Sequence, residues 1–501
     1  MPDVTVVGAG PNGLAAAAVM ARAGLAVEVF EAAPVVGGGT RTAELMQPGH
    51  FHDVCSAVHP MALASPFFRA FELSRRMDLV TPELSFGSPL DGGRSALAYR
   101  SLDRTAAGLG RDGAAYRRLM GPIVRNIDDV MDFTQNQLFR LPRNPVAAGI
   151  FGLRTLEQGS GLWNARFREE AAPALLSGVA AHAVSHLPSL AASGAGLMLG
   201  ALGHAEGWPI PLGGSAAIAA ALATDIEVHG GILHTNTPIN RLADLPPARA
   251  TLLDVAPRGL VDMAGDSLPG RYRRALEAFR YGNGSCKVDF ILSGPVPWEA
   301  AELADAGTVH VGGTRAELAH AENEVSAGRH PERPYVLVAQ PSRFDPQRAP
   351  AGRHTLWTYC HVPAGSTRDM AEAITAQLER FAPGFRDLVV DTNVVTAAQL
   401  AEYNRNYIGG DFSAGTMDLR GLVQRPVVSR HPWHPNARRL PLFLLHAARS
   451  RGHGHARAAR GNPCAEGHLP AARSGVGPGR AVAKTQHFQA LPVANSTCCA
   501  G

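Results

Sequence analysis

Near the start of the chain, short apolar runs alternate with a longer run of small residues. Residues 4–7 and 25–30 have the length and composition of buried β-strands, and the alanine-rich run 14–23 between them is typical of a helix. The same order returns much later, with a predicted helix at 216–223, two glycines and a strand at 232–239. We therefore predict an α/β domain that is interrupted by a second, α+β domain.

The interrupting part begins with a largely helical pattern over residues 61–200. Its last stretch, 171–203, is apolar and rich in small residues, which predicts buried helices. The functional alternatives for this stretch are the wall of an apolar cavity and a membrane-facing patch. Residues 285–295 alternate as a strand with Lys287 and Asp289 on one face, where an ion pair on the strand surface is expected.

The first strand and helix are joined by a glycine motif of the form G-x-G-x-x-G. In such a motif Gly8 permits a tight turn, Gly10 lets the backbone approach a pyrophosphate, and Gly13 lets helix and strand pack closely. The second apolar run ends in Glu31, which can accept hydrogen bonds from a ribose hydroxyl. This context predicts a dinucleotide with its diphosphate at the helix N-terminus; a glycine-rich turn without ligand is the alternative.

A second glycine turn follows directly and carries an arginine. Gly38 and Gly39 bring backbone close to the same diphosphate, and Arg41 can offer a planar fork of donors to phosphate oxygens. Two glycine turns separated by an acid resemble the FAD-binding start of flavoprotein oxidoreductases. The alternative is a surface loop with a solvated arginine.

Composition narrows the class of protein. The chain has 501 residues, of which 46% are hydrophobic and 18% charged, as in a globular enzyme of two to four domains. Its six cysteines contain no C-x-x-C pair, which argues against a disulfide framework and against a flavin disulfide reductase. The early first strand leaves no room for a signal peptide, and no apolar run has the length of a membrane span, so we expect a cytoplasmic protein.

Several longer segments resemble one family, the phytoene-desaturase-like FAD-dependent oxidoreductases. The resemblance is closest to the branch called pyridine nucleotide-disulfide oxidoreductase domain-containing protein 2, and it covers roughly residues 3–430. The matching segments are 7–14 (VGAGPNGL), 52–60 (HDVCSAVHP), 203–215 (GHAEGWPIPLGGS), 294–298 (GPVPW), 307–313 (GTVHVGG), 350–363 (PAGRHTLWTYCHVP) and 380–385 (RFAPGF).

The resemblance implies a Rossmann-type FAD-binding domain with an inserted substrate domain. The residues expected to contact FAD are Gly8, Gly10, Gly13, Glu31, Gly38, Gly39 and Arg41, with Ile239 near the adenosine half. The expected division assigns 1–80, 206–262 and 406–436 to the FAD domain, 81–205 and 263–405 to the substrate domain, and 437–501 to a separate tail.

The tail departs from the family. After about residue 437 the family has an apolar strand and a Gly-Met-x-Gly helix start that caps the flavin, whereas this chain has arginine-, alanine- and glycine-rich sequence. A shifted reading frame is the simplest explanation; a basic tail for nucleic acid or anionic lipid and a disordered tail are alternatives. Because one helix-end contact contributes up to about 2 kcal/mol, we expect weak or absent FAD binding in this chain.

The chemistry expected is oxidation of a hydrophobic small molecule by hydride transfer to flavin, followed by reoxidation by an outside electron acceptor. His59 and His182 are the candidate proton-transfer residues, with a structural role as the alternative. Lys287 could approach the flavin, as a lysine does in amine oxidases of this fold. No metal site and no specific nucleic acid are expected; peripheral membrane contact and a homo-oligomer stay open. A defective or non-catalytic flavoprotein that acts as a binding protein is the alternative function.

Overall fold

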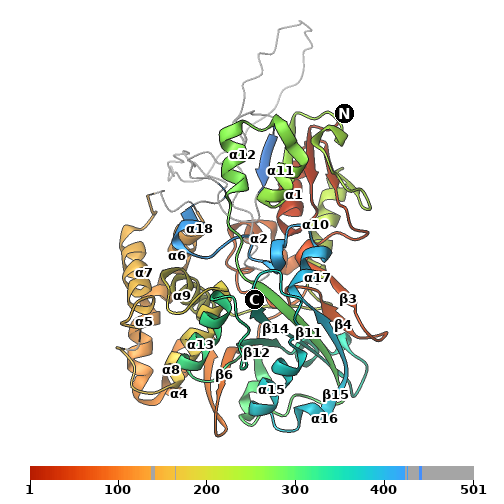
Figure 1. Cartoon of the computed structure of the whole chain (residues 1–501). Helices are drawn as coiled ribbons and strands as arrows, with labels where there is room; N and C mark the ends of the chain where they lie inside the picture. Colours follow the sequence, from red (N-terminus) through yellow and green to blue (C-terminus); the bar gives the residue numbers. More distant parts are fainter. Residues whose placement is uncertain (137–140, 164, 424–425, 427–438, 443–501) are drawn as a thin grey trace, which may run out of the picture.

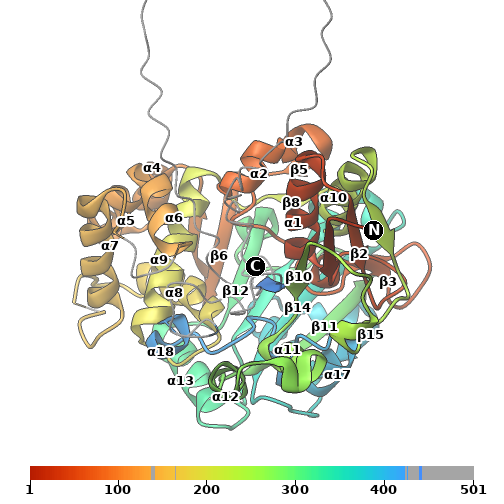
Figure 2. The same ribbon diagram turned by 90° about the horizontal axis from the view of Figure 1, so that it is seen from above.

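The structure is a computed structural model that describes residues 1–136, 141–163, 165–423, 426 and 439–442. Two sheets organise these residues, one of five strands and one of seven. The smaller sheet and its helices lie at one end of the molecule, and a block of helices lies at the other, with the larger sheet between them (Figures 1 and 2). The protein is a mixed α/β structure with a Rossmann-like domain, as the sequence predicts.

The five-stranded sheet is parallel and has the strand order β16-β10-β1-β2-β9. Strand β1 is buried along its whole length, which explains its largely apolar sequence. Helix α1 (Pro11–Arg22) makes the crossover from β1 to β2 and packs with helix α10 (Ala216–Val228) on an apolar core. The strands are β1 (Val4–Val7), β2 (Val27–Phe30), β9 (Ile232–His234), β10 (Ala250–Asp254) and β16 (Arg439–Leu442).

Strand β9 is shorter than the predicted strand 232–239. The chain leaves the sheet at Asn236, whose φ of 52° is left-handed, and Pro238 follows, which has no N–H to donate to a ladder. The turn is held by two backbone bonds, from the N–H of Asn236 to Ala33 O at 3.0 Å and from the N–H of Thr237 to Glu31 O at 2.8 Å.

Strand β16 supplies the fifth position of the parallel sheet, where Leu440 pairs with Leu252 of β10. Its four residues fall inside the range 437–501 that the sequence assigns to a separate tail. The rest of that range, for which a shifted reading frame is the expected explanation, lies outside the described residues.

The seven-stranded sheet is mostly antiparallel, with the order β15-β11-β14-β13-β12-β6-β7. One of its faces packs on an apolar core that includes helix α15 (Ala371–Phe381), and the other faces the helical block and the Rossmann-like domain. The strands are β6 (Leu84–Leu90), β7 (Arg94–Tyr99), β11 (Gly284–Leu292), β12 (Ala306–Val311), β13 (Val336–Ala339), β14 (His354–Val362) and β15 (Val389–Val395).

The helical block covers the β6 and β12 end of this sheet. The stretch 171–203 forms buried helices, as predicted, because nearly every residue of α8 and α9 is enclosed. None of the helices in the described part of the chain combines the length and apolar character that a bilayer crossing needs. The main helices of the block are α4 (Leu102–Gly108), α5 (Gly113–Arg125), α6 (Ile127–Thr134), α7 (Pro145–Gln158), α8 (Ala171–Ala180) and α9 (Leu190–Ala205).

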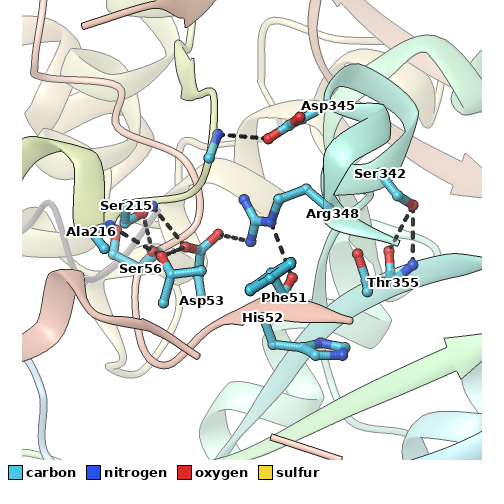
Figure 3. Close-up of polar contacts among 12 residues, drawn as sticks. Phe51, His52, Asp53, Ser56, Ser215, Ala216, Ser342, Asp345, Arg348 and Thr355 are labelled. Atoms are coloured by element: carbon cyan, nitrogen blue, oxygen red, sulfur yellow. Dashed lines mark hydrogen bonds and ion pairs between the residues drawn. The ribbon is translucent and has the colours of Figure 1, made fainter. Parts of the chain in front are cut away.

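A buried ion pair joins the two domains (Figure 3). Arg348, at the end of the 3-10 helix η7 (Pro346–Arg348), donates from Nη2 to Asp53 Oδ2 at 2.7 Å, and their side chains are 1% and 0% exposed. Asp53 ends β4 (Phe51–Asp53), which pairs with β3 (Thr42–Glu44). Asp53 Oδ1 accepts from the Ser215 N–H at 2.8 Å and from the Thr42 hydroxyl at 2.7 Å. The pair therefore fixes the β3–β4 hairpin between the two sheets.

Candidate functional site

A cavity of about 850 Å³ lies where the parallel strands end, at their carboxyl edge. Ligands of doubly wound α/β folds bind at this edge. The cavity brings together seven of the residues that the sequence predicts to contact a dinucleotide, namely Gly8, Gly10, Glu31, Gly38, Gly39, Arg41 and Ile239.

Gly13, the eighth predicted residue, lies behind the cavity wall and closes the first glycine turn. A Cβ at Gly13 would lie 2.0 Å from the carbonyl oxygen of Gly8, so only glycine lets α1 start this close to β1. Gly8 has a φ of +95°, in the region that favours glycine. The turn is therefore built as the motif predicts.

The second glycine turn packs directly on the first. The N–H of Gly37 donates to Ala9 O at 2.7 Å, and a Cβ at Gly38 would lie 3.0 Å from the Cα of Gly10. Gly38 and Gly39 begin the 3-10 helix η1 (Gly38–Thr40). Two turns that the sequence separates by the second strand thus form one wall, in which a side chain at Gly38 would displace the first turn.

Glu31 is oriented by three donors. Its carboxylate accepts from the N–H groups of Ala9 and Ala33, at 2.8 and 2.9 Å, and from Arg41 Nη2 at 3.2 Å. Arg41 also donates to Tyr403 Oη at 3.1 Å and to a backbone carbonyl oxygen. These bonds use three of the five N–H groups of the guanidinium, so its fork is directed chiefly at the protein and the remaining donors are left for a phosphate.

Asp254 is a site residue that sequence reasoning missed. It ends β10 beside β1, is 2% exposed, and accepts from the Gly13 N–H through Oδ2 at 3.0 Å. Burial raises the pKa of its carboxyl to about 7, and the charge of Glu31 adds to the increase. The available signal was an apolar run, residues 251–253, that ends in an acid as the run before Glu31 does.

The far wall of the cavity comes from segment 401–408, which also escaped prediction. It includes the end of α17 (Ala397–Tyr403) and the loop that follows. Asn406 joins this loop to the end of β10, because its Nδ2 donates to the Asp254 carbonyl oxygen at 3.3 Å and its Oδ1 accepts from the Ala256 N–H at 2.8 Å. Nothing in the local sequence of this segment marks it as part of a binding site.

The two predicted proton-transfer histidines lie on different elements. His59 is fully buried near the domain interface, with Nε2 2.7 Å from Ser215 Oγ, and burial lowers its pKa to about 4. His182, in the 3-10 helix η3 (Ala181–Ala183), has Nε2 2.9 Å from Nε2 of His310. His182 therefore contacts a residue of the seven-stranded sheet, whereas His59 is tied to the start of α10.

The face of the seven-stranded sheet toward the helical block and the Rossmann-like domain carries a row of buried polar side chains. We call this set the polar face; its members are Ser285, Lys287 and Asp289 of β11, Thr308 and His310 of β12, and Thr355, Trp357 and His361 of β14. Lys287 and Asp289 form the expected ion pair, but it is enclosed rather than on the strand surface, because the β3–β4 hairpin covers it through His52.

One pair on the polar face has the geometry of an oriented base. His361 Nδ1 lies 2.8 Å from both carboxylate oxygens of Glu322, on α13 (Arg315–Ser326), and both side chains are buried. His361 Nε2 and Trp357 Nε1 are buried without a hydrogen-bond partner in the described structure. A buried polar atom without a partner is costly, so these atoms are candidates for contact with a bound molecule.

Comparison with known proteins agrees with this geometry. Residues 6–71 match the family model of the NAD(P)-binding Rossmann-like domain. The chain is 24% identical over 509 residues to the rat pyridine nucleotide-disulfide oxidoreductase domain-containing protein 2, covering 86% of this chain and 87% of the rat protein. It is 26% identical over 434 residues to an uncharacterized protein of Mycobacterium tuberculosis, covering 75% and 77%.

Solved structures share the fold at low identity. A double mutant of putrescine oxidase aligns with a TM-score of 0.57 at 18% identity, over 88% of this chain and 93% of that one. Cyclohexylamine oxidase from Brevibacterium oxydans IH-35A aligns with a TM-score of 0.53 at 15% identity, with the same coverage. The chain thus has the fold of these oxidases, and its predicted resemblance to pyridine nucleotide-disulfide oxidoreductase domain-containing protein 2 is confirmed.

Proposed function

We propose that this chain is an FAD-dependent oxidoreductase of the dehydrogenase or desaturase type that oxidises a hydrophobic small molecule. One observation carries the proposal: two glycine turns, the strand-end acid Glu31 and Ile239 all line one cavity at the carboxyl edge of a parallel sheet. The sequence relatives named as oxidoreductases support the same class.

The residues present fit an adenine dinucleotide. The two glycine turns are packed too closely for side chains, since a Cβ at Gly10 would lie 3.0 Å from Asp254 Oδ2 and a Cβ at Gly38 would lie 3.0 Å from Gly10 Cα. Glu31 keeps one lone pair, on Oε2, for a ribose hydroxyl after accepting its three bonds, and the start of α1 offers a positive helix end to a diphosphate. Arg41 and Ile239 complete the walls. When bound, the flavin would accept a hydride from the substrate.

The substrate region is assigned to the polar face and the apolar helices opposite it. Helices α8 and α9 supply a wall without charged side chains, which suits a hydrophobic molecule and excludes water. The His361–Glu322 pair can hold or accept a proton at Nε2 of His361, because the carboxylate fixes Nδ1 as the donor nitrogen. His182 contacts His310 of the polar face and is a second candidate for proton transfer. His59 is the third candidate; its contact is with Ser215 at the start of α10 rather than with the polar face.

Titration with FAD tests the proposal. FAD added to the purified chain should show saturable quenching of flavin fluorescence, at the weak affinity expected for a chain whose tail departs from the family. Glu31→Gln should weaken binding further, by about tenfold or more, because a hydrogen bond to a charged group contributes roughly 1.5–3 kcal/mol. Glu28→Gln is the matched control, since Glu28 lies on the same strand but outside the cavity.

The outcomes separate the two functions. Bound flavin that is bleached anaerobically by an apolar substrate supports the oxidoreductase. Bound flavin that no substrate reduces favours the alternative, a non-catalytic flavoprotein that acts as a binding protein. No saturable binding, or equal affinity of the Glu31→Gln variant and the unchanged chain, would refute the proposed cofactor site.

A further inference from the structure

Asp254 has a position that the glycine motif alone does not explain. All three glycines of the motif point toward it: a Cβ at Gly8 would lie 2.7 Å from the Asp254 carbonyl oxygen, and Cβ atoms at Gly10 and Gly13 would lie 3.0 and 3.2 Å from Asp254 Oδ2. The first turn is therefore moulded around this side chain. Any group that approaches the backbone at Gly10 approaches the Asp254 carboxyl as well.

The two oxygens of this carboxyl are in different situations. Oδ2 accepts from the Gly13 N–H at 3.0 Å, whereas Oδ1 is buried and has no hydrogen-bond partner in the described structure. Asp254 also lines the cavity. A buried acid with one oxygen unpaired is expected to find a partner in a bound molecule.

Within the described part of the chain, no cation balances the Asp254 carboxyl. Among the described residues its side chain forms no ion pair, and the charged groups that share the cavity are Glu31, Arg41, Arg258, Asp262, Glu402 and Arg405. Arg41 is bound to Glu31, and the electrostatic influence of Glu31 on Asp254 is repulsive. Burial without a counter-ion, beside a second acid, favours the neutral form. Accordingly the pKa of this carboxyl is raised to about 7.

We propose that Asp254 is a binding residue for the diphosphate of the dinucleotide and acts as a neutral carboxylic acid, donating from Oδ1 while Oδ2 accepts from Gly13. This inference rests on the proposed function. A carboxylate so close to the glycine turn would repel a diphosphate, whereas the protonated acid supplies a donor to it. Above about pH 7, binding therefore takes up a proton.

The direction of the pH dependence follows. Below about pH 7 the acid is already protonated, so dinucleotide affinity is constant. Above that pH the proton must be acquired on binding, so affinity falls by up to about tenfold per pH unit. The flavin and adenine groups of FAD do not titrate between about pH 6 and 8.5, so the fall reports the protein.

Calorimetric titration with FAD tests this on the whole chain, at pH 6 to 8.5 and in two buffers with different heats of ionisation. The difference between the buffers gives the number of protons taken up, which should approach one at about pH 8. Asp254→Asn keeps a donor and an acceptor, so it should bind FAD with pH-independent affinity and about tenfold more tightly than the unchanged chain at pH 8. Asp262→Asn, on the exposed rim of the same cavity, should keep the pH slope.

The results that overturn the two proposals are distinct. No FAD binding by the unchanged chain at any pH overturns the proposed function, and this inference with it. Binding without proton uptake overturns the inference alone, and so does an equal pH slope in the Asp254→Asn variant. The proton count needs no variant, so it decides the matter even where a substitution prevents folding.

Discussion

Breaking the buried ion pair between Asp53 and Arg348 should destabilise the protein strongly. In Asp53→Asn the guanidinium keeps only the bond from Nε to Phe51 O at 3.0 Å, while Nη1 has no partner even in the unchanged protein. In Arg348→Met the carboxylate keeps the Ser215 and Thr42 donors but loses its counter-ion. Each change leaves a charge enclosed at 1% exposure or less.

The expected cost is about 3–5 kcal/mol for each single variant, because removal of one partner leaves an uncompensated buried charge. The double variant, Asp53→Asn with Arg348→Met, should recover part of this loss, since no unpaired charge stays behind. The cycle of four proteins should therefore give a coupling energy well above 1 kcal/mol between residues in direct contact. The exposed pair Arg343–Asp305, with N–O 2.8 Å, is the control, for which exposed pairs give roughly 0.2–1 kcal/mol.

Urea denaturation at constant pH, followed by tryptophan fluorescence and far-ultraviolet circular dichroism, measures these free energies of unfolding. A loss below about 1 kcal/mol in either single variant would refute the reasoning. So would single-variant losses that simply add in the double variant, because additivity means that the two side chains do not interact.

Other predictions concern glycine, histidine and surface leucine positions. Gly13→Ala should abolish FAD binding and lower thermal stability, since its Cβ would meet backbone at 2.0 Å, whereas Gly152→Ala in α7, with nothing within 4 Å, should change neither. Burial lowers the pKa of His59 and His204 to about 4, so both stay neutral in the folded protein down to about that pH. Because the unfolded chain binds these protons at about pH 6.5, the free energy of unfolding should fall by up to roughly 3 kcal/mol per histidine as the pH is lowered from about 6.5 to 4. In His59→Gln, urea midpoints at several pH values should show a smaller fall. Leu153→Lys, at a side chain 67% exposed, should shift the urea midpoint little, within about 0.5 kcal/mol.

The sequence predicts best those buried elements whose residues form a continuous apolar or alternating pattern. Strand β1 has its predicted bounds, and β11 was expected at 285–295 and found at Gly284–Leu292. The order of the seven-stranded sheet could not be predicted, because β6 pairs with β12 across more than two hundred residues and no local pattern encodes that register. The early end of β9 depends on the left-handed backbone of Asn236 and on its bond to Ala33, which come from the tertiary structure, and on Pro238.

The candidate site divides in the same way. Its glycine turns and Glu31 lie within contiguous motifs, so their convergence on one cavity could be predicted from spacing. Asp254 enters only because β10 lies beside β1, with Leu253 opposite Val7, and Tyr403 enters only because helix α17 ends at the cavity. Such contributions come from tertiary packing. The catalytic residues are the least predictable part, because a histidine has many structural roles and its pattern in the sequence carries no geometry.

The cavity and the domain interface share one short segment of chain, and this couples them. Arg41 lines the cavity, and the next residue, Thr42, donates from Oγ1 to Asp53 and accepts from the Ala216 N–H at 3.1 Å. A dinucleotide that contacts Arg41, as proposed, would therefore also stabilise the hairpin that holds Asp53 against Arg348. Because a ligand at a hundred times its dissociation constant stabilises the binding-competent state by about 2.7 kcal/mol, cofactor binding is comparable in size to the ion pair itself. With the proposed dinucleotide bound, the two domains would be held together both by the Asp53–Arg348 pair and by the occupied cavity next to it.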